Sequence, residues 1–243
     1  MEIVILDGYP ATRGDYNYDF LKKYGDVIYY DRTPYELIAQ RAKNADIVLA
    51  NKIVIDKPIF DQLPKLKMIA MLATGYNSID IQTAKERGIY VCNIPKYSSP
   101  SVAQFTFALL LEITNQVGLH NQSVKNGEWA ACPDFCYNKT RQIELMGKTI
   151  GLIGYGDIAK QVAIMAKAFG MNVLGYRRSG GTDENAQIVS LDYLLANSDI
   201  ISLHCPLNAQ SDKLICNATI NQMKDNVIII NTARGGLVNE QEL

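Results

Sequence analysis

The sequence lacks the charge pattern of a protein that binds nucleic acid or an anionic membrane. Among its 243 residues, 24 Lys and Arg balance 25 Asp and Glu, which leaves a net charge of −1. Nucleic-acid and membrane-surface proteins carry a basic face, which this composition does not supply. We therefore expect neither nucleic acid nor a membrane as a partner.

Long apolar runs and paired cysteines are also absent. The longest apolar stretch, Phe105 to Ile113, falls short of the roughly 20 residues that span a bilayer, and Met1 to Asp7 has no basic region of a signal peptide. The five cysteines form no C-x-x-C pair, and neither histidine lies at zinc-ligand spacing. We expect free thiols, no metal site and a location in the cytoplasm.

The sequence does contain short apolar runs that alternate with amphipathic stretches. Hydrophobic residues make up 48% of the chain, enough for a buried core. Runs that are apolar on both faces are typical of buried parallel strands. Five such runs predict a flavodoxin-like doubly wound α/β domain over residues 1–98. The runs are Ile3–Leu6, Val27–Tyr30, Ile47–Ala50, Met68–Leu72 and Tyr90–Cys92, with helices expected between them, for example over Pro34–Lys43 and Ile79–Arg87.

A second alternating series follows a long helix that we expect to start at Ser101. The stretch Trp129–Gln142 is irregular, and it either packs on a partner subunit or is an ordinary surface excursion. The later strands predict a Rossmann doubly wound parallel sheet and a nucleotide-binding domain over residues 99–243. These strands are Thr149–Ile153, Asn172–Tyr176, Gln187–Val189, Asp199–His204 and Asn226–Asn231.

A glycine-rich turn joins the first of these strands to a helix expected over Ile158–Phe169. It reads G-x-G-x-x-A and consists of Gly154, Tyr155, Gly156, Asp157, Ile158 and Ala159. Gly154 permits a tight turn, Gly156 lets the backbone approach a pyrophosphate, and Ala159 keeps the helix close to the strand. The helix N-terminus offers free N–H groups to phosphates. A purely structural turn is the alternative, but the order of strand, turn, helix and strand favours a dinucleotide site.

The residues after the second strand bear on which dinucleotide binds. An NAD site usually has Asp or Glu there, which accepts hydrogen bonds from the ribose hydroxyls. This chain has Arg177, Arg178 and Ser179. Because a guanidinium pairs with a 2′-phosphate and cannot accept those hydrogen bonds, we predict a preference for NADP(H), with NAD(H) possible. The alternative is that both arginines point to solvent.

Several motifs together resemble those of the D-isomer-specific 2-hydroxyacid dehydrogenases, and the resemblance extends from Met1 to Leu243. Residues Asp134–Cys136 and Ile143–Lys148 look most like the glycerate dehydrogenase, or hydroxypyruvate reductase, branch. The motifs that carry the family resemblance are Ala73–Asp80, Ser98–Gln104, Gly151–Ala159, Ser202–Leu207 and Asn231–Gly236.

The resemblance implies hydride transfer between the nicotinamide C4 and the C2 of a small 2-oxo or 2-hydroxy acid such as hydroxypyruvate or glyoxylate. It implies a substrate domain followed by a nucleotide domain, and a homodimer. The family's catalytic arginine corresponds to Arg234, which can clamp a carboxylate and polarise a carbonyl; a structural ion pair at a strand end is the alternative. The family's substrate loop corresponds to Thr74, Gly75, Tyr76 and Asn77. Its cofactor contacts near the nicotinamide correspond to Val102, His204, Cys205, Pro206, Thr232 and Ala233.

The proton donor of this family, a histidine held by a glutamate, lies downstream of the arginine motif. The chain ends nine residues after Arg234 and contains only His120 and His204, so we assign no general acid. Asn239 to Glu242 resembles a helix start, and we expect a C-terminally truncated chain. The alternative function is that of an inactive paralogue that only binds NAD(P)(H).

Overall fold

The computed structural model describes all residues from Met1 to Leu243. It divides them into two compact units, Met1–Tyr97 and Ser98–Leu243. No helix is both long enough and apolar enough to span a membrane. The roles of the two units as substrate and nucleotide domains stay predictions at this point.

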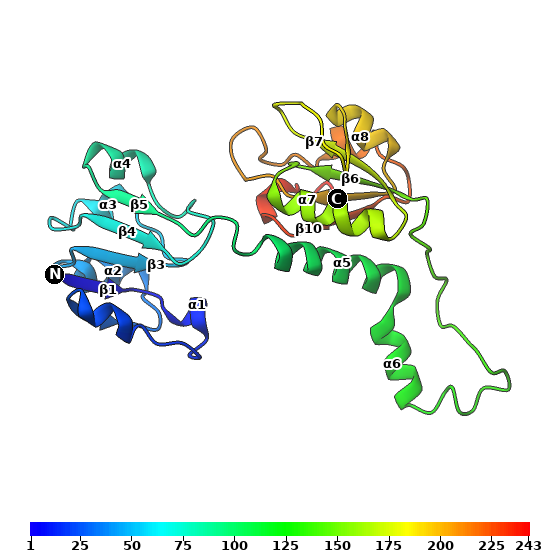
Figure 1. Cartoon of the computed structure of the whole chain (residues 1–243), viewed down its shortest axis with the longest axis horizontal. Helices are drawn as coiled ribbons and strands as arrows, with labels where there is room; N and C mark the ends of the chain where they lie inside the picture. The colour runs from blue at the N-terminus through cyan, green and yellow to red at the C-terminus, as the bar shows by residue number, and fades with distance from the viewer. The chain divides into compact units, whose positions relative to one another are not determined.

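The first unit is built on a five-stranded parallel sheet with the order β2-β1-β3-β4-β5 (Figure 1). This is the flavodoxin-like order, as predicted. The strands are β1 (Glu2–Ile5), β2 (Asp26–Tyr29), β3 (Ile47–Ala50), β4 (Met68–Met71) and β5 (Tyr90–Cys92). The helices are α1 (Tyr9–Thr12), the 3-10 helix η1 (Asp19–Lys23), α2 (Tyr35–Ala42), α3 (Lys57–Phe60) and α4 (Ile81–Glu86).

Alternation along the strands divides the core of the first unit into two layers. Val4 of β1 packs with Ile38 of α2 and Phe60 of α3 on one face of the sheet. Ile3 and Ile5 point to the opposite face, as successive residues of a strand must. Because β1, β3 and β4 pair in parallel, their carboxyl ends lie at one edge, where the loop after β4 carries the predicted substrate residues.

The second unit is built on another parallel sheet, with the order β10-β9-β6-β7-β8. Counted within the unit, this is the Rossmann order 3-2-1-4-5, as predicted. The strands are β6 (Thr149–Ile153), β7 (Asn172–Tyr176), β8 (Gln187–Ile188), β9 (Ile200–Leu203) and β10 (Ile228–Asn231). The helices are α5 (Ser99–Asn115), α6 (Val117–Lys125), α7 (Asp157–Ala168), α8 (Leu191–Asn197), α9 (Asn217–Ile220) and the 3-10 helix η2 (Gly235–Leu237).

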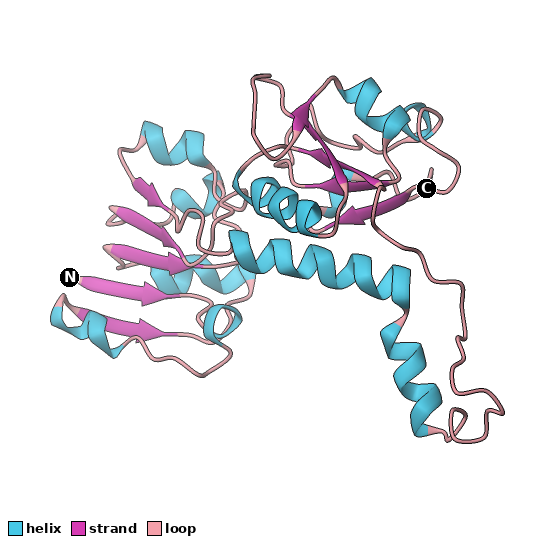
Figure 2. Ribbon diagram, turned by 45° about the vertical axis from the view of Figure 1, so that its right-hand side comes forward, coloured by secondary structure: helices cyan, strands magenta, loops and turns pink.

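Helices cover both faces of the second sheet. Helices α5 and α7 pack together on one face (Figure 2), with Phe107 and Val162 in a core shared with Leu152 of β6. Helix α8 covers the other face, where Leu194 packs against Ile201. Helix α6 and the irregular segment after it extend away from this sheet in both views (Figures 1 and 2).

Most predicted helix and strand bounds differ from the structure by one or two residues. Helix α5 begins at Ser99 and not at Ser101, because Pro100 fits the first turn of a helix, where no N–H is needed. Helix α7 begins at Asp157, one residue before the predicted start. The helix-start pattern at Asn239–Glu242 forms a turn, with Glu242 N donating to Asn239 O at 3.0 Å.

Candidate functional site

A cavity of about 500 Å³ lies at the carboxyl ends of β6, β7 and β9 in the second unit. Ligands of doubly wound sheets bind at this position, beyond the strand ends where the strand order reverses. The predicted cofactor residues that line it are Gly154, Tyr155, Gly156, Arg177, Arg178, Ser179, His204, Cys205 and Pro206. The structure thus brings together segments that are up to about 50 residues apart in the sequence.

The glycine-rich turn has the geometry that close approach of a phosphate needs. Gly154 has φ +90°, and a Cβ there would lie within 3.0 Å of the backbone nitrogen of Cys205, which no side chain could tolerate. A Cβ on Gly156 would instead face open space, with Gly154 O at 4.0 Å as its nearest neighbour. The N–H groups of Ile158 and Ala159, in the first turn of α7, have no acceptor within the chain. The turn therefore fits a pyrophosphate, with N–H donors and a space that only glycine leaves open.

The arginines after β7 do not simply point to solvent. Arg177 is half-buried, and its Nε donates to Gly180 O at 2.5 Å while its Nη2 donates to Thr182 O at 3.3 Å. Arg178 is exposed, and its Nη1 donates to the side-chain oxygen of Gln210. Both arginines line the cavity.

The cavity wall also includes residues that the sequence analysis missed, and they come mainly from the loop after β9. In that loop Ser211 is buried, and its Oγ donates to Pro206 O at 2.6 Å. No motif marks this loop in the sequence, because its residues reach the cavity only through the pairing of β9 with β6. The missed lining residues are Ile153, Tyr176, Leu191, Asn208, Gln210, Ser211 and Leu214.

Five predicted cofactor residues lie outside the lining of this cavity: Asp157 and Ile158 start α7 beside it, and Val102, Thr232 and Ala233 lie near one another. The hydroxyl of Thr106 donates to Val102 O at 2.9 Å and lies 3.3 Å from the hydroxyl of Thr232. Ala233 follows directly, and its N–H donates to Asn231 Oδ1 at 3.0 Å. Hydrogen bonds thus bring the start of α5 to the end of β10.

His204 is a neutral residue with one unused nitrogen. Its Nε2 lies 2.9 Å from Ser202 Oγ, and its Nδ1 is buried without a hydrogen-bond partner in the protein. Burial lowers the pKa of His204 from 6.5 to about 4. A buried polar atom without a partner, in a residue that lines the cavity, fits a site that a polar ligand completes.

The lowered pKa of His204 predicts a loss of stability in acid. In the unfolded chain the His204 imidazole takes up a proton near pH 6.5, and in the folded chain only near pH 4. The contribution of His204 to the free energy of unfolding is therefore full above pH 6.5 and falls as the pH drops toward 4. The full loss is on the order of 3 kcal/mol, from about 1.36 kcal/mol for each pKa unit. Burial raises the pKa of Asp7, which opposes the loss at the low end of this window. Denaturant unfolding from pH 7 to 4.5 measures the slope.

The variant His204→Asn should flatten that slope, because it removes the imidazole whose pKa is lowered by burial. An unchanged slope in the His204 variant would show that other groups cause the acid sensitivity.

The loop after β4 exposes a row of backbone N–H groups. Thr74 Oγ1 donates to Ile94 O at 2.9 Å, and Asn93 Nδ2 donates to Thr74 O at 2.8 Å, which fixes the loop. The N–H groups of Thr74, Gly75, Tyr76 and Asn77 donate to no group of the chain. Successive free N–H groups make an anion-binding concavity, as a carboxylate needs.

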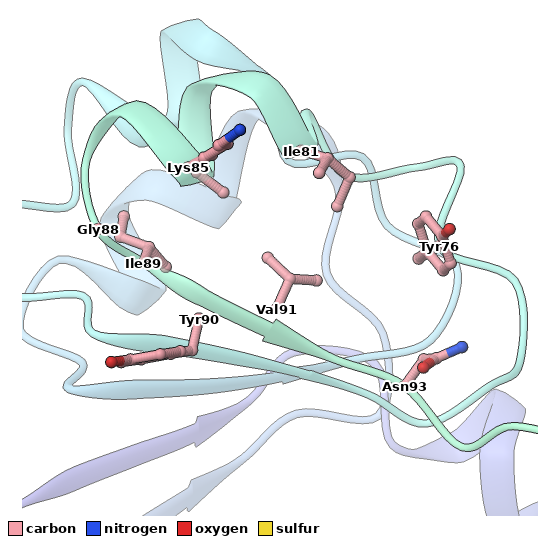
Figure 3. Close-up of a pocket in the computed structure, with 9 residues that line it drawn as sticks. Tyr76, Ile81, Lys85, Gly88, Ile89, Tyr90, Val91 and Asn93 are labelled. Carbon is pink, nitrogen blue, oxygen red and sulfur yellow. The ribbon is translucent and has the colours of Figure 1, made fainter.

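A second, larger cavity of about 610 Å³ lies between α4 and β5 in the first unit. Figure 3 shows Ile81 from α4 and Val91 from β5 pointing toward this space, with Tyr76 and Asn93 at one end. Tyr76 is the only predicted substrate residue in its wall, and Lys85 is its only charged one. Most of its wall is apolar, and only one of the four predicted substrate residues reaches it, so we place no chemistry there.

Arg234 follows β10, at the carboxyl edge of the second sheet. Asn231 Nδ2 donates to Arg234 O at 2.8 Å, which fixes the backbone, and Arg234 Nη1 donates to Ala233 O at 2.8 Å. No carboxylate lies within ion-pair distance of the exposed guanidinium. The structure therefore does not support a structural ion pair, and the charge is available to a bound anion.

Comparison with known proteins identifies the family. The sequence model described as "D-isomer specific 2-hydroxyacid dehydrogenase, NAD binding domain" matches residues 107–243. The chain is 45% identical over 249 residues to a protein of Blautia hydrogenotrophica named hydroxypyruvate reductase. The alignment covers 100% of this chain and 77% of that protein.

Solved structures agree with this match. One is an acyclic imino acid reductase (Bsp5) in complex with NADPH and D-Arg, with a TM-score of 0.88, 31% identity, and coverage of 100% of this chain and 77% of that one. Another is D-lactate dehydrogenase from Aquifex aeolicus with NAD and lactic acid, with a TM-score of 0.85, 29% identity, and coverage of 100% and 72%. The chain belongs to the family of D-isomer-specific 2-hydroxyacid dehydrogenases and carries its nicotinamide-cofactor-binding fold.

Proposed function

We propose that this dehydrogenase transfers a hydride between NADPH and a small 2-oxo acid, with hydroxypyruvate or glyoxylate as the substrate. The similarity to a protein named hydroxypyruvate reductase supports the choice of substrate. The alternative of an inactive paralogue that only binds the cofactor is not favoured, since relatives named for reductase activity match the chain over most of its length.

The position of Arg234 is the main observation that supports the proposal. Its guanidinium lies beyond the end of β10 and pairs with no carboxylate of the chain. In the proposed reaction it holds the substrate carboxylate and polarises the C2 carbonyl as the hydride arrives. The bound nicotinamide supplies the hydride, and the protein supplies orientation and charge.

The loop of Thr74, Gly75, Tyr76 and Asn77 is the second proposed substrate element. Its free N–H groups would bind carboxylate oxygens without any change in the loop, because Asn93 and Ile94 already hold Thr74. Groups that are fixed before binding lose little entropy on binding.

Neither histidine is proposed as the proton donor. The pKa of His204 is about 4, so near neutral pH this residue is almost entirely in its unprotonated form and cannot serve as a general acid. Both ring nitrogens of His120 lie at hydrogen-bond distance from backbone groups. We propose that His204 instead binds the cofactor through its unpaired Nδ1, together with Val102, Thr232 and Ala233 near the nicotinamide.

A preference for NADPH is proposed from Arg177, Arg178 and Ser179. Arg178 is the more available of the two arginines, because Arg177 already donates to two carbonyls of its own loop. Replacing Arg178 by Ala should lower the ratio of NADPH to NADH affinity by about 10- to 100-fold, the size of a lost charge-assisted hydrogen bond. Fluorescence titration with both cofactors measures the ratio. Arg141→Ala, on an exposed loop, is the matched control; equal ratios in both variants would contradict the assignment.

The experiment that tests the function is oxidation of NADPH and NADH by the purified chain, with hydroxypyruvate and with glyoxylate. Turnover with either acid supports the proposal. Tight cofactor binding without turnover on both acids would point to the binding-only alternative.

We also infer a homodimer through α6 and the segment that follows it. Phe135 is 91% exposed, and Val117, Val124 and Trp129 are exposed as well. Exposed apolar surface of this extent marks a contact with another chain. Light scattering should give a molar mass twice that of one chain. The double variant Phe135→Ser, Trp129→Ser should lower this mass toward that of a single chain. A monomeric wild type would contradict the inference.

A location in the cytoplasm is proposed from the state of the cysteines. All five are free thiols, and burial raises the pKa of the Cys205 thiol, which keeps it protonated. Unpaired thiols are typical of a reducing compartment.

A further inference from the structure

The loop between β7 and β8, residues 177–186, carries the two arginines that line the cofactor cavity. It has no regular secondary structure and contains Gly180 and Gly181, both with positive φ. A loop of this composition samples many conformations unless side chains tie it down. What holds it therefore decides how well the arginines are placed before a cofactor arrives.

Tyr155, the second residue of the glycine-rich turn, reaches under this loop. Its side chain is only 3% exposed, and its ring covers Gly175 of β7, where a Cβ would lie 2.7 Å from Tyr155 Cδ2. Its backbone N–H donates to Tyr176 O at 2.9 Å, so the turn and the end of β7 are already joined. The ring then directs its hydroxyl toward the loop.

The hydroxyl of Tyr155 ends on Asp183 of the loop. It donates to Asp183 Oδ1 at 2.8 Å, and Lys160 Nζ of α7 lies 3.5 Å from Asp183 Oδ2. The Asn185 N–H also donates to Oδ1, at 3.1 Å. One carboxylate thus joins the turn, helix α7 and the loop.

The charge states of Tyr155, Asp183 and Lys160 favour the contacts that join them. The pKa of Asp183 is lowered by the hydrogen bond from the Asn185 N–H, and also by the Tyr155 hydroxyl and by Lys160. The Asp183 carboxylate therefore stays ionised. Burial, together with Asp183, raises the pKa of Tyr155 and keeps the hydroxyl a donor. The side chain of Asp183 is 12% exposed, so water competes little for these bonds.

We propose that Tyr155 is a positioning residue for cofactor selection, which acts by holding Asp183 and so fixing the loop that carries Arg177 and Arg178. Thr182 O, one residue before Asp183, accepts from Arg177 Nη2, so fixing Asp183 also fixes the partner of that guanidinium. The proposal rests on the proposed preference for NADPH. The dinucleotide-binding fingerprint accounts for Gly154 and Gly156 and leaves the residue between them open.

Tyr155→Phe tests the proposal, because it removes one oxygen and keeps the ring that packs on Gly175. Hydrogen exchange of residues 177–186 in the cofactor-free protein should become about ten-fold faster, as expected for a lost hydrogen bond to a charged group. The ratio of NADPH to NADH affinity should fall about ten-fold, and the melting temperature should fall by roughly 3–6 °C. Asp183→Asn keeps an acceptor for the hydroxyl but loses the ion pair, and should give an intermediate result.

Tyr193→Phe on α8 is the matched control, because that tyrosine is exposed and its hydroxyl makes no hydrogen bond in the structure. Unchanged exchange in Tyr155→Phe would overturn the proposal. Faster exchange with an unchanged affinity ratio would also overturn it, since the hydroxyl would then stabilise the loop without positioning the arginines. A wild type that binds both cofactors equally would refute the preference alone, and the exchange rates would still decide whether Tyr155 holds the loop.

Discussion

Replacing Arg234 by Lys should lower kcat/KM for hydroxypyruvate by about 100- to 1,000-fold. That is the usual cost of removing one donor to a developing oxyanion. A lysine keeps the charge but not the planar fork that meets a carboxylate with two parallel bonds. The side chain of Asn231 holds this backbone, because it donates to Arg234 O and accepts from the Ala233 N–H, so the substitution leaves the end of β10 in place. Initial rates of NADPH oxidation measure the effect.

The control for this experiment is Arg141→Lys, on an exposed loop away from the cavity at the strand ends. Cofactor affinity, measured by fluorescence, should stay the same in the Arg234 variant. A variant with near-normal kcat/KM would show that Arg234 does not act on the reacting carbonyl.

The two glycines of the turn should respond in opposite ways to alanine. Gly154→Ala places a Cβ against the backbone of Cys205 at a φ of +90°, which should cost about 3 kcal/mol. The melting temperature should then fall by roughly 6–12 °C. Gly156 has extended backbone and open space around its missing Cβ, so Gly156→Ala should change the melting temperature by no more than about 2 °C.

Cofactor affinity separates the two roles further. Gly156→Ala should weaken NADPH binding by at least about ten-fold, because the added methyl occupies the space through which a pyrophosphate approaches the N-terminus of α7. Calorimetric melting and cofactor titration on the same samples give both numbers. A stable Gly156→Ala variant with normal affinity would place the pyrophosphate elsewhere.

The sequence by itself determined the two sheets and the position of the turn. Both follow from local information. Apolar runs such as Ile47–Ala50 are too short and too rich in β-branched residues for helices, and Gly154, Gly156 and Ala159 lie within one short stretch of the sequence. The starts of α5 and α7 were missed by one or two residues, because several neighbouring residues can begin a helix and local preference does not choose among them.

Only the tertiary structure decided which side chains share the cofactor cavity and which hold one another. Gln210 meets Arg178 and Tyr155 meets Asp183 across separations of 32 and 28 residues. No periodicity encodes these pairs, because they depend on strand order and on how a loop returns to the sheet. The free guanidinium of Arg234 is likewise a tertiary fact: the sequence supplied the charge, and only the packed chain shows that no carboxylate comes near enough to neutralise it.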